Sequence, residues 1–349
     1  MEKRFEPKKI FNTDSRELHE EAKIIGGDPD GIIDFKGTPH TWAKTIYDNM
    51  KARTWFVNQI KNVGKDATNY INLSDAQKRS YDLVLAQLIT NDSIQSTQLV
   101  DNIDRWITSP VVSACLKVQS MEETLHSESY TSMADDIAQD RERIMYLARH
   151  DKELMRKNKA VENMYARCYN GENPTAKDLL VACGANQILE ELVFPNGFAG
   201  ILLLKDILPA SAEFISEIMK DETLSHVPLF KNIFRTIVIE NFDGVLPEDV
   251  EERIIQMVKD MADAERRWGK YALKGIMGAS EKAIDLLVDE QANSVCKNLG
   301  IRKLFSEPKY NPLKELLKEH LRGDGLDTKG NIFEKNVVEY SKNTVIIDF

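Results

Sequence analysis

The sequence predicts an all-α protein built as a helical bundle. Apolar residues recur at helical spacing through most of the chain, and few segments alternate with the period of two that marks strands. Patterns typical of helix starts, such as Ser-Asp-Ala-Gln at residues 74–77 and Ser-Pro at 109–110, precede these segments. The composition, 42% hydrophobic and 29% charged, is that of an ordinary globular protein, and 349 residues suffice for one large domain or two.

Charge, apolar runs and cysteines exclude several classes of protein. The net charge of −10 argues against a nucleic-acid-binding protein. No apolar run reaches the ~18 residues of a membrane span, and the opening MEKRFEPKKIF lacks the apolar core of a secretory signal. We expect a cytoplasmic protein with buried, reduced thiols, because its cysteines are far apart and form no C-x-x-C: Cys115, Cys168, Cys183 and Cys296.

The first half of the chain begins with a polar segment and continues with long helices. Residues 1–37 predict an extended arm. The Thr-Pro pair at 38–39 predicts the N-cap and first position of a helix. The capping box at 74–77 opens a long helix, and the Ser-Pro pair at 109–110 opens another, which we expect to reach about His150.

The second half continues the helical pattern. The Asn-Pro pair at 173–174 opens a helix, and Pro195 within it predicts a kink. Residues 210–240, 247–274 and 281–299 predict further helices, the second with one apolar stripe and the third between a Ser cap and a Gly stop.

The segment SMEETLHSESY offers a carboxylate, an imidazole and a phenol on one helix face. Glu123 and His126 are three residues apart, and Tyr130 lies four beyond His126. Such a Glu-x-x-His pair on two helices, with carboxylates from two more, is the ligand set of di-iron and di-manganese carboxylate bundles. The same spacing also occurs on solvated helix faces. A metal site is therefore predicted only if other helices supply the remaining ligands.

Three other predicted helices offer these ligands. Asp92 lies among apolar residues, where an acid is costly to bury unless it is paired or bound to a metal. Glu190 and Glu191 precede an apolar run, and one of them pointing inward would complete the set. Four carboxylates with two imidazoles suit iron or manganese, and the candidate ligands are Asp92, Glu123, His126, Glu190, Glu222 and His226.

With these motifs, nearly the whole chain resembles the radical-generating small (beta) subunit of class I ribonucleotide reductase. The matching segments, in the same order, are residues 31–55, 92–95, 123–130, 292–305, 331–334, 339–342 and 348–349. The resemblance implies a ferritin-like helical domain over 38–322 with a dinuclear metal site. It also implies an N-terminal arm over 1–37 and a flexible C-terminal tail over 323–349 that binds the large subunit.

The resemblance also implies the chemistry of the candidate site. The six candidate ligands would bind a dinuclear Fe/Fe centre, with Mn/Mn or Mn/Fe as alternatives. Tyr130 would be the tyrosine oxidised to a stable radical, and a modified tyrosine remains open. Phe194, Phe198 and Ile218 match the apolar pocket around the radical, although plain core residues would pack the same way.

The resemblance also implies a relay that exchanges an electron and a proton with a partner subunit. Trp55 and Asp221 match its start, and Tyr340 in the tail matches its continuation; a bare core aromatic is the alternative for Trp55. The apolar residues of 345–349 are typical of a peptide that becomes ordered on a partner. The implied partners are the ribonucleotide reductase large (alpha) subunit, a second copy in a homodimer, and an activating flavoprotein.

Two departures from the family pattern affect the site. The family has Asp-Glu-x-x-His, whereas this chain has one residue more between Asp221 and His226. Spacings of three and four can both face a metal, and a π-bulge could absorb the extra residue, so Glu222 and Thr223 are both candidates for the carboxylate position. We favour Glu222, because Asp221-Glu222 retains the dipeptide of the family that the chain resembles. Pro195 also stands where the family has an aromatic residue.

Two other functions compete with this interpretation. A ferritin-like di-metal oxidase or oxygenase acting on its own substrate would use the same bundle, since fold alone does not fix function. It would leave the Tyr340 tail without a role, so the tail favours the reductase subunit. A metal-free helical scaffold would require six inward polar residues to be accidental.

Overall fold

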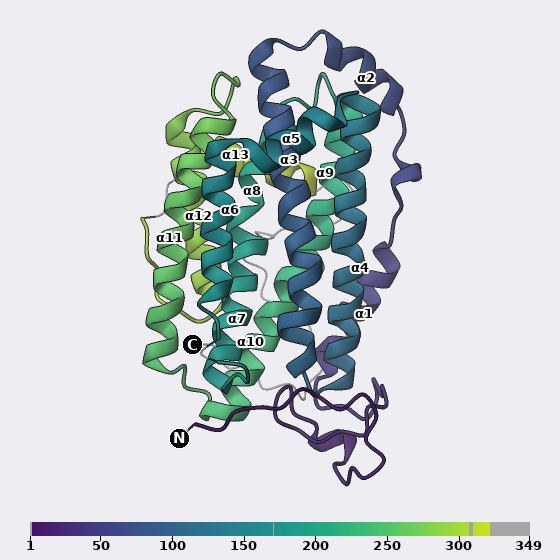
Figure 1. Ribbon diagram of the computed structural model, residues 1–349, viewed down its shortest axis with the longest axis vertical. Helices are drawn as coiled ribbons and strands as arrows, with labels where there is room; N and C mark the ends of the chain where they lie inside the picture. Colours follow the sequence, from purple (N-terminus) through teal and green to yellow (C-terminus); the bar gives the residue numbers. More distant parts are fainter. Residues whose placement is uncertain (1, 170, 307–309, 322–349) are drawn as a thin grey trace.

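Long helices lying side by side make up this protein. The structure is a computed structural model that describes residues 2–169, 171–306 and 310–321. The long helices run along its longest axis (Figure 1), and within the described residues the only strand-like pairings are the isolated bridges Arg4–Thr175 and Ile25–Ile107. The predicted all-α bundle is confirmed.

The first half of the chain supplies two of the helices that carry candidate ligands, α3 and α4. Its α-helices are α1 (Thr41–Arg53), α2 (Val63–Ile71), α3 (Asp75–Gln98), α4 (Pro110–Ser132), α5 (Arg141–His150) and α6 (Lys152–Ala166). Short turns join them: the 3-10 turns η1 (His19–Glu21), η2 (Val57–Gln59) and η4 (Asp104–Trp106), and the π-turns η3 (Leu99–Ile103) and η5 (Met133–Ile137).

In the second half, two π-turns interrupt the helices that carry the other candidate ligands. The α-helices are α7 (Ala176–Ile188), α8 (Pro195–Leu202), α9 (Pro209–Asp221), α10 (Val227–Phe242), α11 (Glu248–Ala272), α12 (Glu281–Asn298) and α13 (Pro312–Leu321). The π-turn η6 (Leu189–Val193) follows α7, and η7 (Glu222–His226) joins α9 to α10.

Three predicted helix starts are confirmed. Ser74 Oγ accepts the Gln77 amide at 3.3 Å while Gln77 Oε1 accepts the Ser74 amide at 2.9 Å, which is the expected capping box of α3. Pro110 is the first residue of α4. Ser280 caps α12 by accepting the Ala283 amide at 3.1 Å.

Other boundaries differ from the prediction. Helix α1 begins at Thr41 rather than beside Thr38, because the Thr38 hydroxyl accepts the His40 amide at 3.1 Å and closes a turn before the helix. The helix that begins at Pro110 ends at Ser132 and does not reach about His150: after η5, Gln139 adopts a φ of 56° and Asp140 caps a new helix. Helix α6 occupies a charged segment where no helix was predicted.

The helices bury a continuous apolar interior, and the N-terminal segment closes one end of it. The stripe predicted on α11 is buried, from Val250 to Met261, and all four cysteines are buried and free. The chain before α1 crosses the end of the bundle (Figure 1), with Phe5, Ile24 and Ile25 buried against it. Among the described helices, none combines the length and hydropathy that crossing a bilayer requires.

Candidate metal centre

The six candidate ligands come from four helical segments and are buried together. Helix α3 carries Asp92, α4 carries Glu123 and His126, η6 carries Glu190, and η7 carries Glu222 and His226. None of these residues is more than 3% exposed. Burial of four acids in one place is unusual, because an ionised carboxylate loses its hydration there.

The six side chains form two overlapping groups. Ligand atoms of Glu123, Glu190, Glu222 and His226 lie within 4.8 Å of one another, and so do those of Asp92, Glu123 and His126. Glu123 belongs to both groups, so the two form one cluster. This arrangement could hold a dinuclear metal site.

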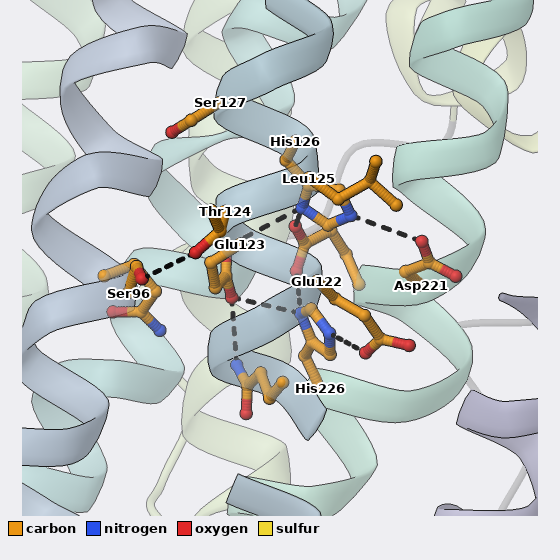
Figure 2. A network of polar contacts seen from close by, with 12 residues as sticks. Ser96, Glu122, Glu123, Thr124, Leu125, His126, Ser127, Asp221 and His226 are labelled. Carbon is orange, nitrogen blue, oxygen red and sulfur yellow. Dashed lines mark hydrogen bonds and ion pairs between the residues drawn. The ribbon is translucent and has the colours of Figure 1, made fainter. Parts of the chain in front are cut away.

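The two ring nitrogens of His126 have different surroundings. One faces the cluster, and the other faces a carboxylate outside it. Its Nδ1 lies 3.3 Å from Glu222 Oε1 and 3.6 Å from Glu123 Oε2. Its Nε2 lies 3.2 Å from Asp221 Oδ2, outside the cluster (Figure 2). A carboxylate behind a histidine of this kind is typical of metal sites, since it fixes the ring and the tautomer.

His226 repeats this arrangement on the other side. Its Nδ1 lies 2.7 Å from Glu222 Oε2 and 3.3 Å from Glu123 Oε1. Its Nε2 lies 2.9 Å from Oε2 of Glu122, on the opposite side of the ring (Figure 2). The ring centroids of His126 and His226 are 5.8 Å apart, so both Nδ1 atoms face the same interior.

The cluster contains polar atoms that fit a bound metal pair. Buried atoms without a hydrogen bond are Asp92 Oδ1 and Oδ2, Glu123 Oε2, Glu190 Oε2, Glu222 Oε1 and His126 Nδ1. Nearly all buried polar atoms in folded proteins have a partner, and an unpaired one costs free energy. Hard oxygen and imidazole donors with free electron pairs are the donor set that iron and manganese take.

The buried carboxylates of the cluster repel one another and would be stabilised by bound positive charge. Burial, followed by the Glu123 charge, holds the pKa of Asp92 well above its usual range. Burial and the charges of Glu222 and Glu123 do the same for the pKa of Glu190. Burial works against the charged form of His226, yet the carboxylates around it raise its pKa. Two divalent ions would roughly neutralise four carboxylates.

The π-turn η7 explains how the extra residue is accommodated. It contains Glu222 through His226, and it brings Glu222 into the cluster while Thr223 lies half-buried outside it. A π-turn adds one residue to a helical turn, so a Glu and a His four apart can face the same point. The geometry therefore favours Glu222 over Thr223, as the sequence did.

The π-turn η6 separates the roles of two adjacent acids. Glu190 points into the cluster, whereas the Glu191 carboxylate accepts hydrogen bonds from Ser294, from Asn298 at 2.9 Å and from Gln187 at 2.8 Å. Pro195 starts a new helix instead of kinking a continuous one, since it has no amide hydrogen to continue α7. Of the two acids considered for the site, Glu190 is therefore the inward one.

A buried ion pair lies against the end of η6. The Val193 carbonyl accepts from Gln87 Nε2 at 3.3 Å and from Lys157 Nζ at 3.5 Å. Lys157 Nζ also pairs with Glu265 Oε1 at 2.8 Å, and both side chains are at most 1% exposed. These residues tie η6 to α3, α6 and α11.

Sequence reasoning missed most of the groups that hold the ligands. Gln95 and Gln119 donate hydrogen bonds to Glu190, and so does Asn186 at 3.4 Å. Each stands three or four residues along the chain from a candidate ligand, so the same spacing rule could have found them. Lys157 lies in a charged stretch and had no comparable signal.

Tyr130 is fully enclosed. Its side chain is 0% exposed, and burial, followed by the Asp92 charge, holds the pKa of its phenol well above the usual range. The phenol therefore keeps its proton. Phe194, Phe198 and Ile218 are buried as expected, and the first two stack with ring centroids 5.7 Å apart.

A hydrogen-bonded chain leads away from the cluster. Trp55 Nε1 donates to Asp221 Oδ2 at 2.8 Å, and the same oxygen is 3.2 Å from His126 Nε2. The chain joins α4, α9 and the segment after α1. Tyr340, predicted to continue this path, lies outside the described residues.

Comparison with known proteins decides the family. A family model described as "Ribonucleotide reductase, small chain" matches residues 32–312. The chain belongs to the ribonucleotide reductase small-chain family. Homologues carry the name of a ribonucleoside-diphosphate reductase subunit, so the predicted resemblance and the assignment to an oxidoreductase subunit are confirmed.

Individual ribonucleotide reductase relatives span nearly the whole chain. It is 29% identical over 341 residues to the ribonucleoside-diphosphate reductase subunit beta of Treponema pallidum, covering 95% of this chain and 94% of that one. The solved R2 subunit from Clostridium botulinum superposes with a TM-score of 0.83 at 26% identity, covering 91% of this chain and 99% of that one. The dimanganese(II) NrdF structure from Streptococcus sanguinis shares the fold, with a TM-score of 0.71 at 19% identity, covering 83% and 99%.

Proposed function

We propose that this chain is the radical-generating small subunit of a class I ribonucleoside-diphosphate reductase. Its six clustered side chains would bind a dinuclear centre: Asp92, Glu123, His126, Glu190, Glu222 and His226. The observation that carries the proposal is the pair of histidines, each with Nδ1 towards the cluster and Nε2 on a carboxylate outside it. Fe/Fe is the proposed centre, with Mn/Mn or Mn/Fe as alternatives.

The protein's own part in radical formation is to prepare Tyr130. A bound metal pair would supply the one-electron oxidising power, drawn from oxygen, that side chains lack. In this proposal Tyr130 would lose one electron and its hydroxyl proton, and the Asp92 carboxylate, whose charge acts on the phenol, would take up that proton. Full burial excludes water and reductants from the phenol, which favours a long-lived radical.

Transfer to the large subunit would begin along the hydrogen-bonded chain. His126, Asp221 and Trp55 form an unbroken path between the cluster and the segment after α1. In this proposal an electron passes along it together with a proton exchange at Asp221. Tyr340 would continue the path from the tail at 323–349, which would bind the large subunit.

The assembly we propose has several parts. The arm at 1–37 and the ferritin-like domain at 38–322 would form a homodimer with a second copy, and an activating flavoprotein is a further candidate partner. Four free, buried cysteines are typical of proteins in a reducing compartment, and we propose the cytoplasm.

Reconstitution tests this function. The full chain is loaded aerobically with Fe(II) or Mn(II), and electron paramagnetic resonance is recorded. We expect about two metal ions per chain and a tyrosyl signal. The signal should vanish in Tyr130→Phe and persist in Tyr81→Phe, which removes another buried phenol; a signal that survives in Tyr130→Phe would refute the assignment.

Truncation after Gly330 tests the proposed tail separately. The shortened chain should keep its metal and its radical but lose binding to the large subunit. Reductase activity that survives this truncation would rule out the role of the tail and of Tyr340.

A further inference from the structure

The two oxygens of the Glu190 carboxylate are in different environments. Oε1 accepts hydrogen bonds from Gln95 Nε2, from Gln119 Nε2 at 2.7 Å and from Asn186 Nδ2 at 3.4 Å. Oε2 accepts none and faces the cluster. Three neutral amides from α3, α4 and α7 therefore meet at one oxygen and leave the other free.

Behind two of these amides, those of Gln95 and Asn186, lies a phenol that orients them. The Tyr165 hydroxyl donates to Gln95 Oε1 at 3.1 Å, and Asn186 Oδ1 lies 3.4 Å from it. Burial holds the pKa of the Tyr165 phenol well above its usual range, so the hydroxyl remains a donor. An amide whose oxygen accepts from a phenol must turn its nitrogen the other way, towards Glu190.

Asp92, the carboxylate at the other side of the cluster, is held by no cage of amides; the polar side chain beside it is Tyr130. Neither of its oxygens accepts a hydrogen bond from a side-chain amide, and both are buried. Asp92 can therefore offer one oxygen or both. Glu190 cannot turn Oε1 inward without breaking three hydrogen bonds.

We infer that Tyr165 and the amides of Gln95, Gln119 and Asn186 form a cage that fixes Glu190 with Oε2 as its one metal-facing oxygen. Tyr165 is the positioning residue, although α6 carries none of the proposed ligands. The inference rests on the proposed function, because it gives Glu190 a metal to face. The cage makes the Glu190 side of the centre the more rigid one, because Glu190 can offer only Oε2 to a metal there.

Manganese titration of the full-length apoprotein tests the cage. Mn(II) is added stepwise, and the free ion is followed by electron paramagnetic resonance. Wild type should bind about two ions, and Tyr165→Phe should weaken the second equivalent by about ten-fold while leaving the first unchanged. Tyr169→Phe is the matched control, because Tyr169 donates instead to the Asn102 carbonyl, away from Glu190.

A double-variant comparison separates positioning from a structural role. In a Glu190→Gln background, Tyr165→Phe should change manganese binding no further. The inference fails if Tyr165→Phe titrates like wild type, or if it weakens both ions equally and lowers the melting temperature of the apoprotein more than Tyr169→Phe does. Wild type that binds no manganese would overturn the proposed function as well, whereas two tight ions in Tyr165→Phe would overturn the cage alone.

Discussion

The two halves of the cluster are built from different kinds of backbone. Asp92, Glu123 and His126 project from the regular helices α3 and α4. Glu190, Glu222 and His226 project from the π-turns η6 and η7. In the first half, the 3.6-residue repeat places Glu123 and His126 on one face of α4, and packing of α3 against α4 adds Asp92. In the second half, the turn itself must be held in place by side chains from other helices.

The contrast indicates where this chain can tolerate the insertion or deletion of a residue. A regular helix fixes every following residue in register, so its ligands depend on chain length as much as on side chains. A π-turn absorbs one extra residue, but it leaves backbone groups to be satisfied from outside. At η6 these outside groups include Gln87 and Lys157, which donate to the Val193 carbonyl.

The largest expected effect comes from deleting one residue in each half. Deletion of Thr124 from α4 rotates all later residues by about 100°, which moves Tyr130 off the buried face. We expect it to cost more than about 4 kcal/mol in the free energy of unfolding, whereas deletion of Thr223 should cost about 1 kcal/mol because η7 can become a regular turn. Urea denaturation of the two apoproteins measures this, and equal losses would break the comparison.

The buried ion pair beside η6 gives the next largest effect. Lys157→Met leaves the Glu265 carboxylate buried without its cation, which should lower the free energy of unfolding by about 3–5 kcal/mol. Lys159→Met, two residues along α6, removes an exposed pair with Glu162 and should cost less than about 1 kcal/mol. Denaturation curves of the two variants are compared at one pH. Similar midpoints would show that the buried pair stabilises the protein no more than the exposed pair does.

Adding Glu265→Gln to Lys157→Met refines this result. Removing the unpaired charge should recover a large part of the lost stability. If the double variant is as stable as wild type but binds the second metal ion more weakly, the pair serves to hold the π-turn rather than the fold. Full recovery of both properties would mean that the Lys157 contact with Val193 is dispensable.

The smallest expected effect concerns the alkylation rate of the buried thiols, which should be similar in the two halves of the cluster. Cys115 lies in α4 and Cys183 in α7, and both are at most 1% exposed. Burial raises the pKa of Cys115 to about 12 and shifts that of Cys183 in the same direction. At pH 8 this lowers the thiolate fraction of Cys115 roughly a thousand-fold, so alkylation by iodoacetamide should be slow until the protein unfolds. Faster labelling of Cys183 would show local opening near η6.

The sequence allowed much of the fold to be predicted, but less of the boundaries. Helices α3, α4 and α12 could be assigned because Ser74, Pro110 and Ser280 carry local signals. The end of α4 could not, because the stop depends on η5 and on the left-handed Gln139 rather than on a Gly or Pro. Helix α6 was missed because its charged sequence hides a narrow buried face, with Leu154 and Val161 on it.

The site follows the same division. Glu123 and His126 on α4 come directly from spacing, and Asp92 on α3 comes from the cost of burying an acid among apolar residues. On η7 the spacing alone allowed Thr223 as well as Glu222, and the resemblance to a family decided for Glu222. The groups behind the ligands, such as Lys157 and Glu265, are brought together from distant segments. Their partnership depends on tertiary packing, which no local pattern encodes.

Metal content of three proteins tests most directly whether the π-turn supplies a ligand. Wild type, Glu222→Ala and Thr223→Ala are reconstituted with Fe(II) or Mn(II), and bound metal is measured by elemental analysis. The account predicts about two ions per chain in wild type and in Thr223→Ala, and fewer in Glu222→Ala. Loss of metal in Thr223→Ala with full binding in Glu222→Ala would contradict it.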